Sequence, residues 1–167
     1  MEEVILKDIL IRPIGIVHSP FYEPAGTPIQ PGAALGVKGM VEVFPEYAEG
    51  LKDVDGFSHV TLVFYFHLAG EPKLTAKPFL DDQERGVFAI RGPARPNHIG
   101  ISTVRLVSVE GNVLHVENLD ILNGTPLLDI KPYVPAFDDV GLFKTGWLEE
   151  KIVRLNDVRD DGRFEGD

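Results

Sequence analysis

The sequence predicts a mainly β domain that forms a small closed barrel or a strongly bent sheet, with a few peripheral helices. Short segments rich in Val, Ile, Phe and Thr alternate with many of the 13 prolines and 17 glycines, a pattern typical of strands joined by turns. The chain of 167 residues has the length of one domain, and its 44% apolar residues suffice for one core. Both observations indicate a single compact unit.

Seven segments have strand character, and this number favours a barrel. They are residues 11–18, 39–44, 60–67, 86–90, 102–110, 113–118 and 127–131. The turn at Gly111 and Asn112, with alternating apolar residues on both sides, predicts a β-hairpin. Residues 55–67 form an almost continuous apolar run, so we expect a strand that is buried on both faces and ends at His67.

Two helices and one long loop complete the expected elements. Residues 46–54 and 147–155 are predicted to be helical, the latter because acidic and basic side chains stand at supportive spacing. Residues 21–37 contain several prolines and glycines and predict a long ordered loop, a kind of segment that is often functional. We assign residues 1–137 to the barrel and 138–167 to a helical or extended tail that packs on or near it. The polar end from residue 157 is expected to fray.

Composition and missing motifs exclude several classes of protein. The absence of cysteine excludes disulfides, a thiolate nucleophile and sulfur-ligated zinc. Motifs for a Rossmann site, a P-loop or a serine nucleophile elbow do not occur. The five histidines lack short metal-binding spacings, so we predict no metal site. Residues 1–7 lack the features of a secretory signal, and no apolar run approaches the roughly 18 residues of a membrane helix. We expect a cytoplasmic protein without a membrane partner.

The net charge of −10 argues against non-specific binding of nucleic acid. The cations are nevertheless concentrated in the middle of the chain, while acidic residues crowd the two ends. This distribution allows a local basic face, with a merely solvated surface as the equal alternative. The central cations are Lys73, Lys77, Arg85, Arg91, Arg95, His98 and Arg105.

A loop with two arginines is the most distinctive local feature. Arg91, Arg95 and Asn97 alternate there with prolines and glycines that restrict the shape of the loop. Arginines on a rigid loop suit a carboxylate or phosphate ligand, because each guanidinium offers a planar fork of donors. For either arginine alone, a structural role in holding loop carbonyl groups is an equally good interpretation.

The segment 119–133 combines a turn with a charged strand. Asn123 and Gly124 predict the turn, and Asp129 and Lys131 follow on one side of the next strand. Charged side chains in an apolar strand are costly unless they are paired or used in function. His67, at the end of its own strand, fits a hydrogen-bonded histidine at the edge of the core better than a functional one.

Together, these segments resemble the TsaA/YaeB-like family of tRNA methyltransferases, in the same order and over residues 11–137. The resemblance rests on Pro-Ile-Gly-Ile-Val-His-Ser-Pro at 13–20, Pro-Ile-Gln-Pro-Gly at 28–32, Gly-Phe-Ser-His at 56–59, Arg-Pro-Asn at 95–97, Ile-Gly-Ile-Ser at 99–102 and Asn-Gly-Thr-Pro-Leu-Leu-Asp-Ile-Lys-Pro-Tyr at 123–133. The chain departs from the family at His98, where proline is usual, and at Asn123, where aspartate is common. These departures concern substrate preference more than cofactor binding.

The resemblance implies a homodimeric β-barrel methyltransferase that uses S-adenosyl-L-methionine and methylates N6 of threonylcarbamoyl-adenosine beside the anticodon of tRNA. Its motifs place the cofactor at Gln30, Pro31, Gly32, His67, Leu68, Arg91, Ile101, Ile121, Leu122, Asn123 and Gly124. For the anticodon loop of tRNA we expect contacts with Arg95, Asn97, Lys131 and Tyr133. The sequence does not identify a catalytic base, for which Asp129 and neutral His67 are the candidates.

Two other functions fit the same residues. A barrel methyltransferase acting on a substrate other than RNA would suit the acidic net charge better. A barrel without catalytic activity could instead bind a small ligand through Arg91 and the proline-glycine loop. Methyl transfer to RNA distinguishes all three hypotheses.

Overall fold

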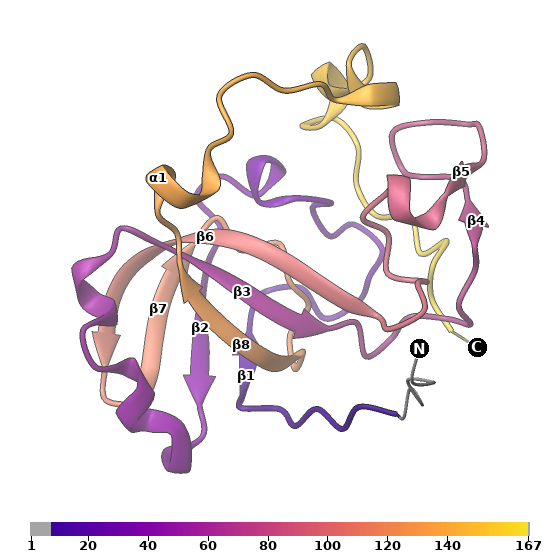
Figure 1. Ribbon diagram of the computed structural model, residues 1–167. Coiled ribbons are helices and arrows are strands. Elements are labelled where there is room, and N and C mark those ends of the chain that lie inside the picture. The colour runs from indigo at the N-terminus through magenta and orange to yellow at the C-terminus, as the bar shows by residue number, and fades with distance from the viewer. Residues whose placement is uncertain (1–7, 167) are drawn as a thin grey trace, which may run out of the picture.

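The computed structural model describes residues 8–166 and contains a closed barrel of antiparallel strands (Figure 1). The barrel strands are β1 (Gly15–His18), β2 (Lys38–Val43), β3 (His59–Tyr65), β6 (Ile99–Glu110), β7 (Val113–Glu117) and β8 (Pro126–Pro132). Their order is β1-β2-β7-β6-β3-β8, closed by pairing of β8 with β1. The predicted mainly β barrel is confirmed. The prediction about a secretory signal concerns residues 1–7, which lie outside the described residues.

The hairpin of β6 and β7 turns at the two residues that the sequence indicates. Glu110 pairs with Val113 across Gly111 and Asn112, and Gly111 has a φ of 62°, a conformation that glycine adopts without steric cost. The Asn112 side-chain amide donates a hydrogen bond of 2.7 Å to the carbonyl oxygen of Val43. The turn is thereby attached to the end of β2.

Alternating burial along the strands fills the barrel. In β3, Val60, Leu62 and Phe64 are buried, while the residues between them are only partly buried. The expectation that this strand is buried on both faces is therefore wrong. Its second face belongs to the outer surface of the barrel wall, where the Thr61 hydroxyl is hydrogen-bonded to that of Thr103 at 2.9 Å.

The segment between β3 and β6 makes an excursion outside the barrel. It contains β4 (Thr75–Ala76) and β5 (Arg85–Gly86), which pair only with each other. The predicted strand at 86–90 is wrong beyond its first residue, because a 3₁₀ helix at Val87–Ala89 follows. Val87 and Ile90 are both buried in a second apolar cluster. Their spacing of three matches the period of a 3₁₀ helix, and not the period of two of a strand.

Both predicted helices are replaced by shorter 3₁₀ helices. Residues 46–54 form 3₁₀ helices at Pro45–Leu51 and Val54–Gly56, separated by Asp53 with a φ of 68°. Residues 147–155 contain 3₁₀ helices at Gly146–Leu148 and Ile152–Arg154, and none of their side chains is fully buried, which leaves little packing to stabilise a longer α-helix. The α-helix α1 (Pro135–Asp138) follows β8 directly. Within residues 8–166, no helix is long and apolar enough to span a membrane.

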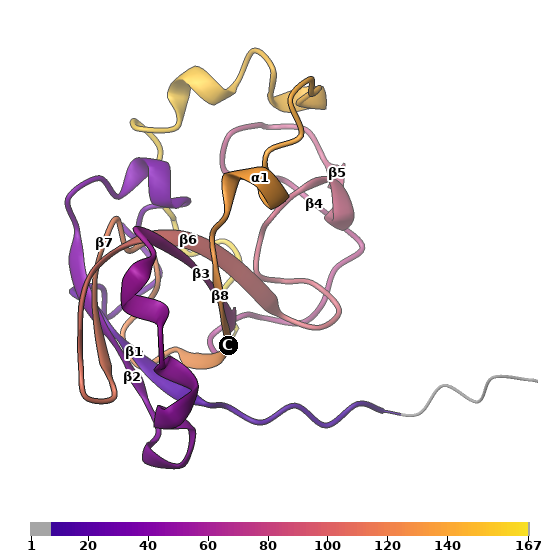
Figure 2. The same ribbon diagram turned by 60° about the vertical axis from the view of Figure 1, so that its left-hand side comes forward.

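The predicted loop at 21–37 and the C-terminal residues lie against each other. The loop contains one 3₁₀ helix, Pro31–Ala33. Isolated bridges join Pro28 to Arg159 and Ala69 to Glu165, and Figure 1 shows the C-terminal end near β4. The fraying expected from residue 157 is wrong for the described residues, because Phe164 is 5% exposed and packs in the second apolar cluster. At the other end, residues 8–13 extend away from the barrel (Figure 2).

Candidate functional site

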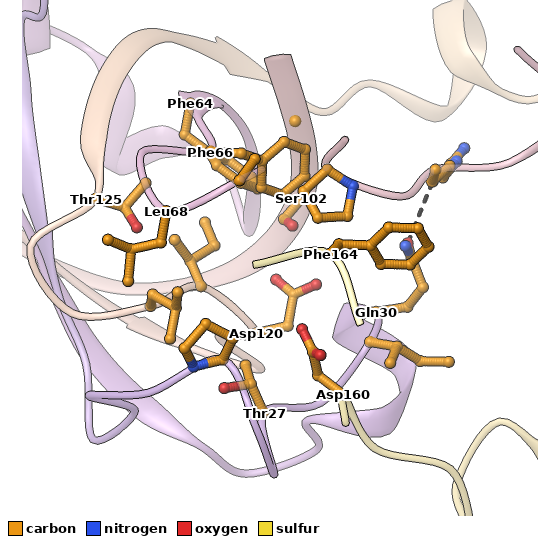
Figure 3. A pocket seen from close by; sticks show the side chains of 18 of the residues that line it. Thr27, Gln30, Phe64, Phe66, Leu68, Ser102, Asp120, Thr125, Asp160 and Phe164 are labelled. Atoms are coloured by element: carbon orange, nitrogen blue, oxygen red, sulfur yellow. Dashed lines mark hydrogen bonds between the residues drawn. The ribbon is translucent and has the colours of Figure 1, made fainter. Parts of the chain in front are cut away.

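A cavity of ≈ 400 Å³ lies where segments from distant parts of the chain meet (Figure 3). Its walls come from the loop 24–30, the end of β3 and the residues up to 69, the loop 90–95, the start of β6, the connection 120–125 and the C-terminal residues 160–165. Small-molecule sites typically enclose about 300–1,000 Å³ and are mainly apolar with a few polar groups. The cavity has the size and the lining of such a site.

The structure brings together most of the residues that the sequence predicts for a cofactor. Those that line the cavity are Gln30, His67, Leu68, Arg91, Ile101, Ile121 and Leu122. The others, Pro31, Gly32, Asn123 and Gly124, directly follow lining residues in the chain but do not line the cavity themselves. The role of these residues in binding stays a prediction.

Asn123 and Gly124 shape one wall from outside. Asn123 accepts a hydrogen bond from the backbone N–H of Ser19 at 3.1 Å, and Gly124 donates to the carbonyl oxygen of Val17 at 2.8 Å. Gly124 has a φ of 79°, a conformation that disfavours other residues. The turn therefore holds the 120–125 connection against the chain that leaves β1.

The two arginines of the predicted loop have different surroundings. Arg91 is exposed at the rim and donates a long hydrogen bond of 3.4 Å to Gln30 Oε1, drawn as a dashed line in Figure 3. Arg95 donates to the carbonyl oxygens of Ile90 at 3.0 Å and Gly92 at 3.2 Å. Arg95 thus holds the loop in shape, as the structural interpretation requires, whereas Arg91 is accessible to a ligand.

Other central cations are also engaged within the protein. Arg85 pairs with Asp81 at 2.6 Å and holds the pKa of that carboxyl group well below its usual range. Arg105 pairs with Glu117 at 2.5 Å. These pairs reduce the cations available for a basic face.

The charges of Asp129 and Lys131 are paired with each other. Their side chains form an ion pair of 3.0 Å and are 47% and 69% exposed. The charges are therefore not buried in an apolar strand, since the end of β8 reaches the surface. Asp129 lines a separate hollow with Tyr47 and Leu51, so the structure does not bring it together with His67.

The remaining predicted residues for tRNA also lie outside the cavity lining. Asn97 is exposed in the loop before β6. The Tyr133 hydroxyl donates to Asp139 at 2.8 Å, and the acceptor raises the pKa of Tyr133. Both positions stay predictions as RNA contacts.

His67 is a hydrogen-bonded histidine in the cavity wall. Its Nδ1 lies 3.4 Å from the hydroxyl oxygen of Thr125, and burial lowers the pKa of His67. The imidazole is consequently neutral around pH 7, where it can accept a proton.

Asp120 lines the cavity but is not among the residues that the sequence predicts for the site. Burial raises the pKa of Asp120 to about 7, against the opposing effects of the Ser102 hydroxyl and the positive charge of Arg91. Its Oδ1 atom is inaccessible and has no hydrogen-bond partner among residues 8–166. Asp120 stands between Leu119 and Ile121, so it is also a charged residue in an apolar stretch, which is costly unless the charge is paired or used.

The sequence contains no signal that places the C-terminal residues at the cavity. Figure 3 shows the Asp160 carboxylate and the Phe164 ring at the cavity, in a segment that the sequence predicts to fray. The Asp160 backbone donates to the Thr27 carbonyl oxygen at 2.9 Å. Burial raises the pKa of Asp160 to about 6, and Asp161 and Glu165 act in the same direction.

The fold is a small antiparallel barrel, and aromatic rings, a buried carboxyl group and a rim arginine line the cavity beside it. The model of the tRNA-methyltransferase O N-terminal domain matches residues 16–139. The chain belongs to this family, which confirms the resemblance inferred from its motifs.

Known proteins agree with this assignment. A probable S-adenosyl-L-methionine-binding protein of Pyrococcus abyssi is 56% identical over 156 residues, which cover 93% of this chain and 85% of that protein. The human tRNA (adenine(37)-N6)-methyltransferase is 37% identical over 140 residues, 78% of this chain and 31% of that protein. The crystal structure of TrmO from Pseudomonas aeruginosa superposes with a TM-score of 0.71 at 38% identity, covering 84% of this chain and 63% of that one. The chain thus spans less than two thirds of the last two proteins.

Proposed function

We propose that this protein uses S-adenosyl-L-methionine to methylate N6 of an adenine in tRNA. The observation that carries the proposal is the convergence of Gln30, His67, Leu68, Arg91 and the 121–122 turn on one cavity in a chain of the tRNA-methyltransferase O family. The relatives named as S-adenosyl-L-methionine-binding proteins and as tRNA (adenine(37)-N6)-methyltransferases support the same cofactor and reaction.

The residues of the cavity fit this cofactor. Arg91, at the rim, offers a fork of donors to the carboxylate of the methionine portion. Phe64 and Phe66 provide apolar wall, which suits the nucleoside portion. The Asp120 carboxyl group lines the cavity and its Oδ1 atom has no hydrogen-bond partner among residues 8–166, so this group suits a polar or positively charged part of the ligand.

The cofactor, when bound, supplies a methyl group on a positively charged sulfur that is already a good leaving group. The task of the protein is therefore to hold donor and acceptor in line and to exclude water. The loop 24–30 and the C-terminal residues 160–165 are hydrogen-bonded to each other and both line the cavity, and Arg95 keeps the loop 90–95 in shape. Neutral His67 is available in the wall to take the proton that the adenine nitrogen loses.

We extend the proposal to threonylcarbamoyl-adenosine beside the anticodon as the substrate and to a homodimer as the working form. Bases of an anticodon loop unstack readily and can reach a cavity. The segment after β8 exposes the apolar side chains Phe137, Leu142 and Phe143, which supports an interface. Such a substrate implies a cytoplasmic protein. The mass in solution tests the dimer, with Leu142→Glu as the variant expected to yield monomers.

Methyl transfer to a substrate other than RNA is the second candidate. The net charge of −10 and the engagement of Arg85, Arg95 and Arg105 within the protein favour it, because RNA affinity depends on free cations.

The test is incubation with radiolabelled S-adenosyl-L-methionine and total tRNA from a strain that lacks an enzyme of this kind, followed by nucleoside analysis. We expect label on threonylcarbamoyl-adenosine. Label on another adenosine would mean that the substrate is a different tRNA nucleoside. If the protein binds the cofactor in a separate measurement but leaves the RNA unlabelled, the result would favour a non-RNA substrate or a binding role.

A further inference from the structure

The Asp120 carboxyl group is the part of the cavity that the proposed mechanism leaves without a specific partner. Its Oδ1 atom is inaccessible and has no hydrogen-bond partner among residues 8–166, and Figure 3 shows the carboxyl group directed into the cavity. An unpartnered buried acceptor is costly to keep. A ligand group that complements it is the simplest reason for its presence.

The aromatic side chains in the same cavity indicate which kind of group that is. Phe64 and Phe66 line it with their rings edge to face, 5.1 Å between centroids. Gly100 makes room for both rings, because a Cβ atom at this position would lie 2.6 Å from Phe64 and 2.7 Å from Phe66. Aromatic faces attract cations, and a carboxylate does so more strongly. The aromatic rings and the carboxylate therefore suit a cation. Because the attraction comes from charge, the cation does not need N–H donors.

The other charged and titratable groups of the cavity indicate where each end of the ligand binds. The lining also contains His67, Arg91, Arg95, Asp160 and Glu165. Arg95 is occupied by loop carbonyl groups, and Arg91 at the rim suits a carboxylate. The amino acid end of a ligand therefore belongs at the rim, which leaves the centre of the ligand for the buried carboxyl group.

On the basis of the proposed function, we propose that Asp120 is the anionic partner of the positively charged sulfur of the methyl donor. Asp120 is then a specificity-determining residue, since it makes the cavity bind S-adenosyl-L-methionine more tightly than the neutral product S-adenosylhomocysteine.

The charge that Asp120 recognises disappears in the reaction. When the methyl group forms its bond to the adenine nitrogen, the electron pair of the broken S–C bond stays on sulfur, which becomes neutral, and one proton leaves the nitrogen. Asp120 then faces no cation. Because burial raises its pKa to about 7 in the ligand-free cavity, the carboxyl group returns to partial protonation near pH 7 and the attraction is lost. Product release follows from the change of charge.

Isothermal titration calorimetry with three ligands tests the proposal. S-adenosyl-L-methionine and sinefungin carry a positive charge at the reacting position, sinefungin as an amine, whereas S-adenosylhomocysteine is neutral there. We expect Asp120→Asn to weaken binding of the two charged ligands at least about tenfold more than binding of the neutral one. Asp157→Asn, an exposed position in the C-terminal segment, is the matched control and should change none of the three affinities.

Three results would overturn the proposal. Equal losses for all ligands would assign Asp120 to a portion that they share, such as the ribose or the adenine. A selective loss in Asp160→Asn, with none in Asp120→Asn, would assign the role to the other carboxylate. A wild-type protein that binds none of the ligands would overturn the proposed function as well, whereas binding without methylation of tRNA would overturn only the tRNA substrate.

Proton release by the wild-type protein gives a second readout that needs no variant. Titrations at pH 7 in two buffers of different ionisation enthalpy count the protons released on binding. We expect about half a proton more for S-adenosyl-L-methionine than for S-adenosylhomocysteine, because the cation drives ionisation of Asp120. His67, Asp160 and Glu165 line the cavity for both ligands, so they cannot cause a difference in proton release between the two. Equal proton release for both ligands would contradict the proposal.

Discussion

The interior of the barrel and the cavity beside it are built in opposite ways. The barrel interior is apolar, and its fully buried side chains come mainly from paired strands, among them Val17, Val41, Val60, Leu62, Val104 and Leu114. The cavity is lined largely by loops, strand ends and the C-terminal residues, and its walls contain the buried polar residues Ser102 and Thr125 as well as Asp120. The strand ladders thus contain the apolar core that stabilises the fold, while the connections contain the costly polar groups.

Truncation of the barrel core should have the largest effect on folding. Leu62 is 0% exposed, so Leu62→Ala leaves a cavity between strands that cannot collapse, and we expect a loss of about 3 kcal/mol in the free energy of unfolding. Urea denaturation measures it. Val107→Ala, at a half-exposed position of β6, should cost less than about 1 kcal/mol, and equal costs would refute the assignment of stability to the interior.

Truncation of the C-terminal aromatic anchor should affect binding more than folding. Phe164 packs edge to face on Phe79, 5.1 Å between centroids, and lines the cavity. Because the C-terminal residues can unfold locally without opening the barrel, we expect Phe164→Ala to destabilise the protein by less than Leu62→Ala, but to weaken S-adenosyl-L-methionine binding about tenfold. If affinity for S-adenosyl-L-methionine is unchanged and the free energy of unfolding falls strongly, Phe164 supports the fold as the barrel residues do and not the ligand site.

Removal of the rim arginine should weaken cofactor binding and leave the fold intact. Arg91→Ala removes an exposed guanidinium whose hydrogen bond to Gln30 is long, so we expect the melting temperature to stay nearly constant. Calorimetric affinity for S-adenosyl-L-methionine should fall several-fold up to about tenfold, as for a charge-assisted contact. Arg154→Ala, at an exposed position outside the cavity lining, is the control. If the folded Arg91→Ala protein binds S-adenosyl-L-methionine as tightly as the wild type, Arg91 does not contact the cofactor.

Neutralisation of the buried carboxyl group should raise stability in a pH-dependent way. The pKa of Asp120 is raised from 3.8 to about 7 in the folded protein, so between these values the folded state binds more protons than the unfolded state. The contribution of Asp120 to stability is therefore lost as the pH rises towards 7. We expect Asp120→Asn to exceed the wild type by more than about 1 kcal/mol at pH 8 and by much less at pH 4.

Thermal unfolding of both proteins across this range measures the difference. Asp157→Asn, which replaces an exposed carboxyl group, should show a difference that does not change with pH. A stabilisation of Asp120→Asn that is equal at pH 4 and pH 8 would indicate packing, and not the buried charge, as its cause.

The same contrast explains how much could be predicted from the sequence. The hairpin at Gly111 and Asn112 was predictable because its signal is local. That Arg91 and Gln30 lie at one cavity was predictable because motifs carry them, while their role in binding stays a prediction. The 3₁₀ helix at Val87–Ala89 was not, since three apolar residues in a short segment fit either period. Phe164 and Asp160 reach the cavity through contacts with residues around 27 and 69, and contacts across such distances leave no pattern in one sequence.

Hydrogen exchange with and without S-adenosyl-L-methionine tests most directly whether the cavity is the site. We expect added protection in residues 27–32, 66–69, 120–124 and 160–165, which form or flank its walls, and no change around the separate hollow at residues 46–54. Protection confined to that hollow, or absent from the C-terminal residues and the 120–124 turn alike, would contradict the account.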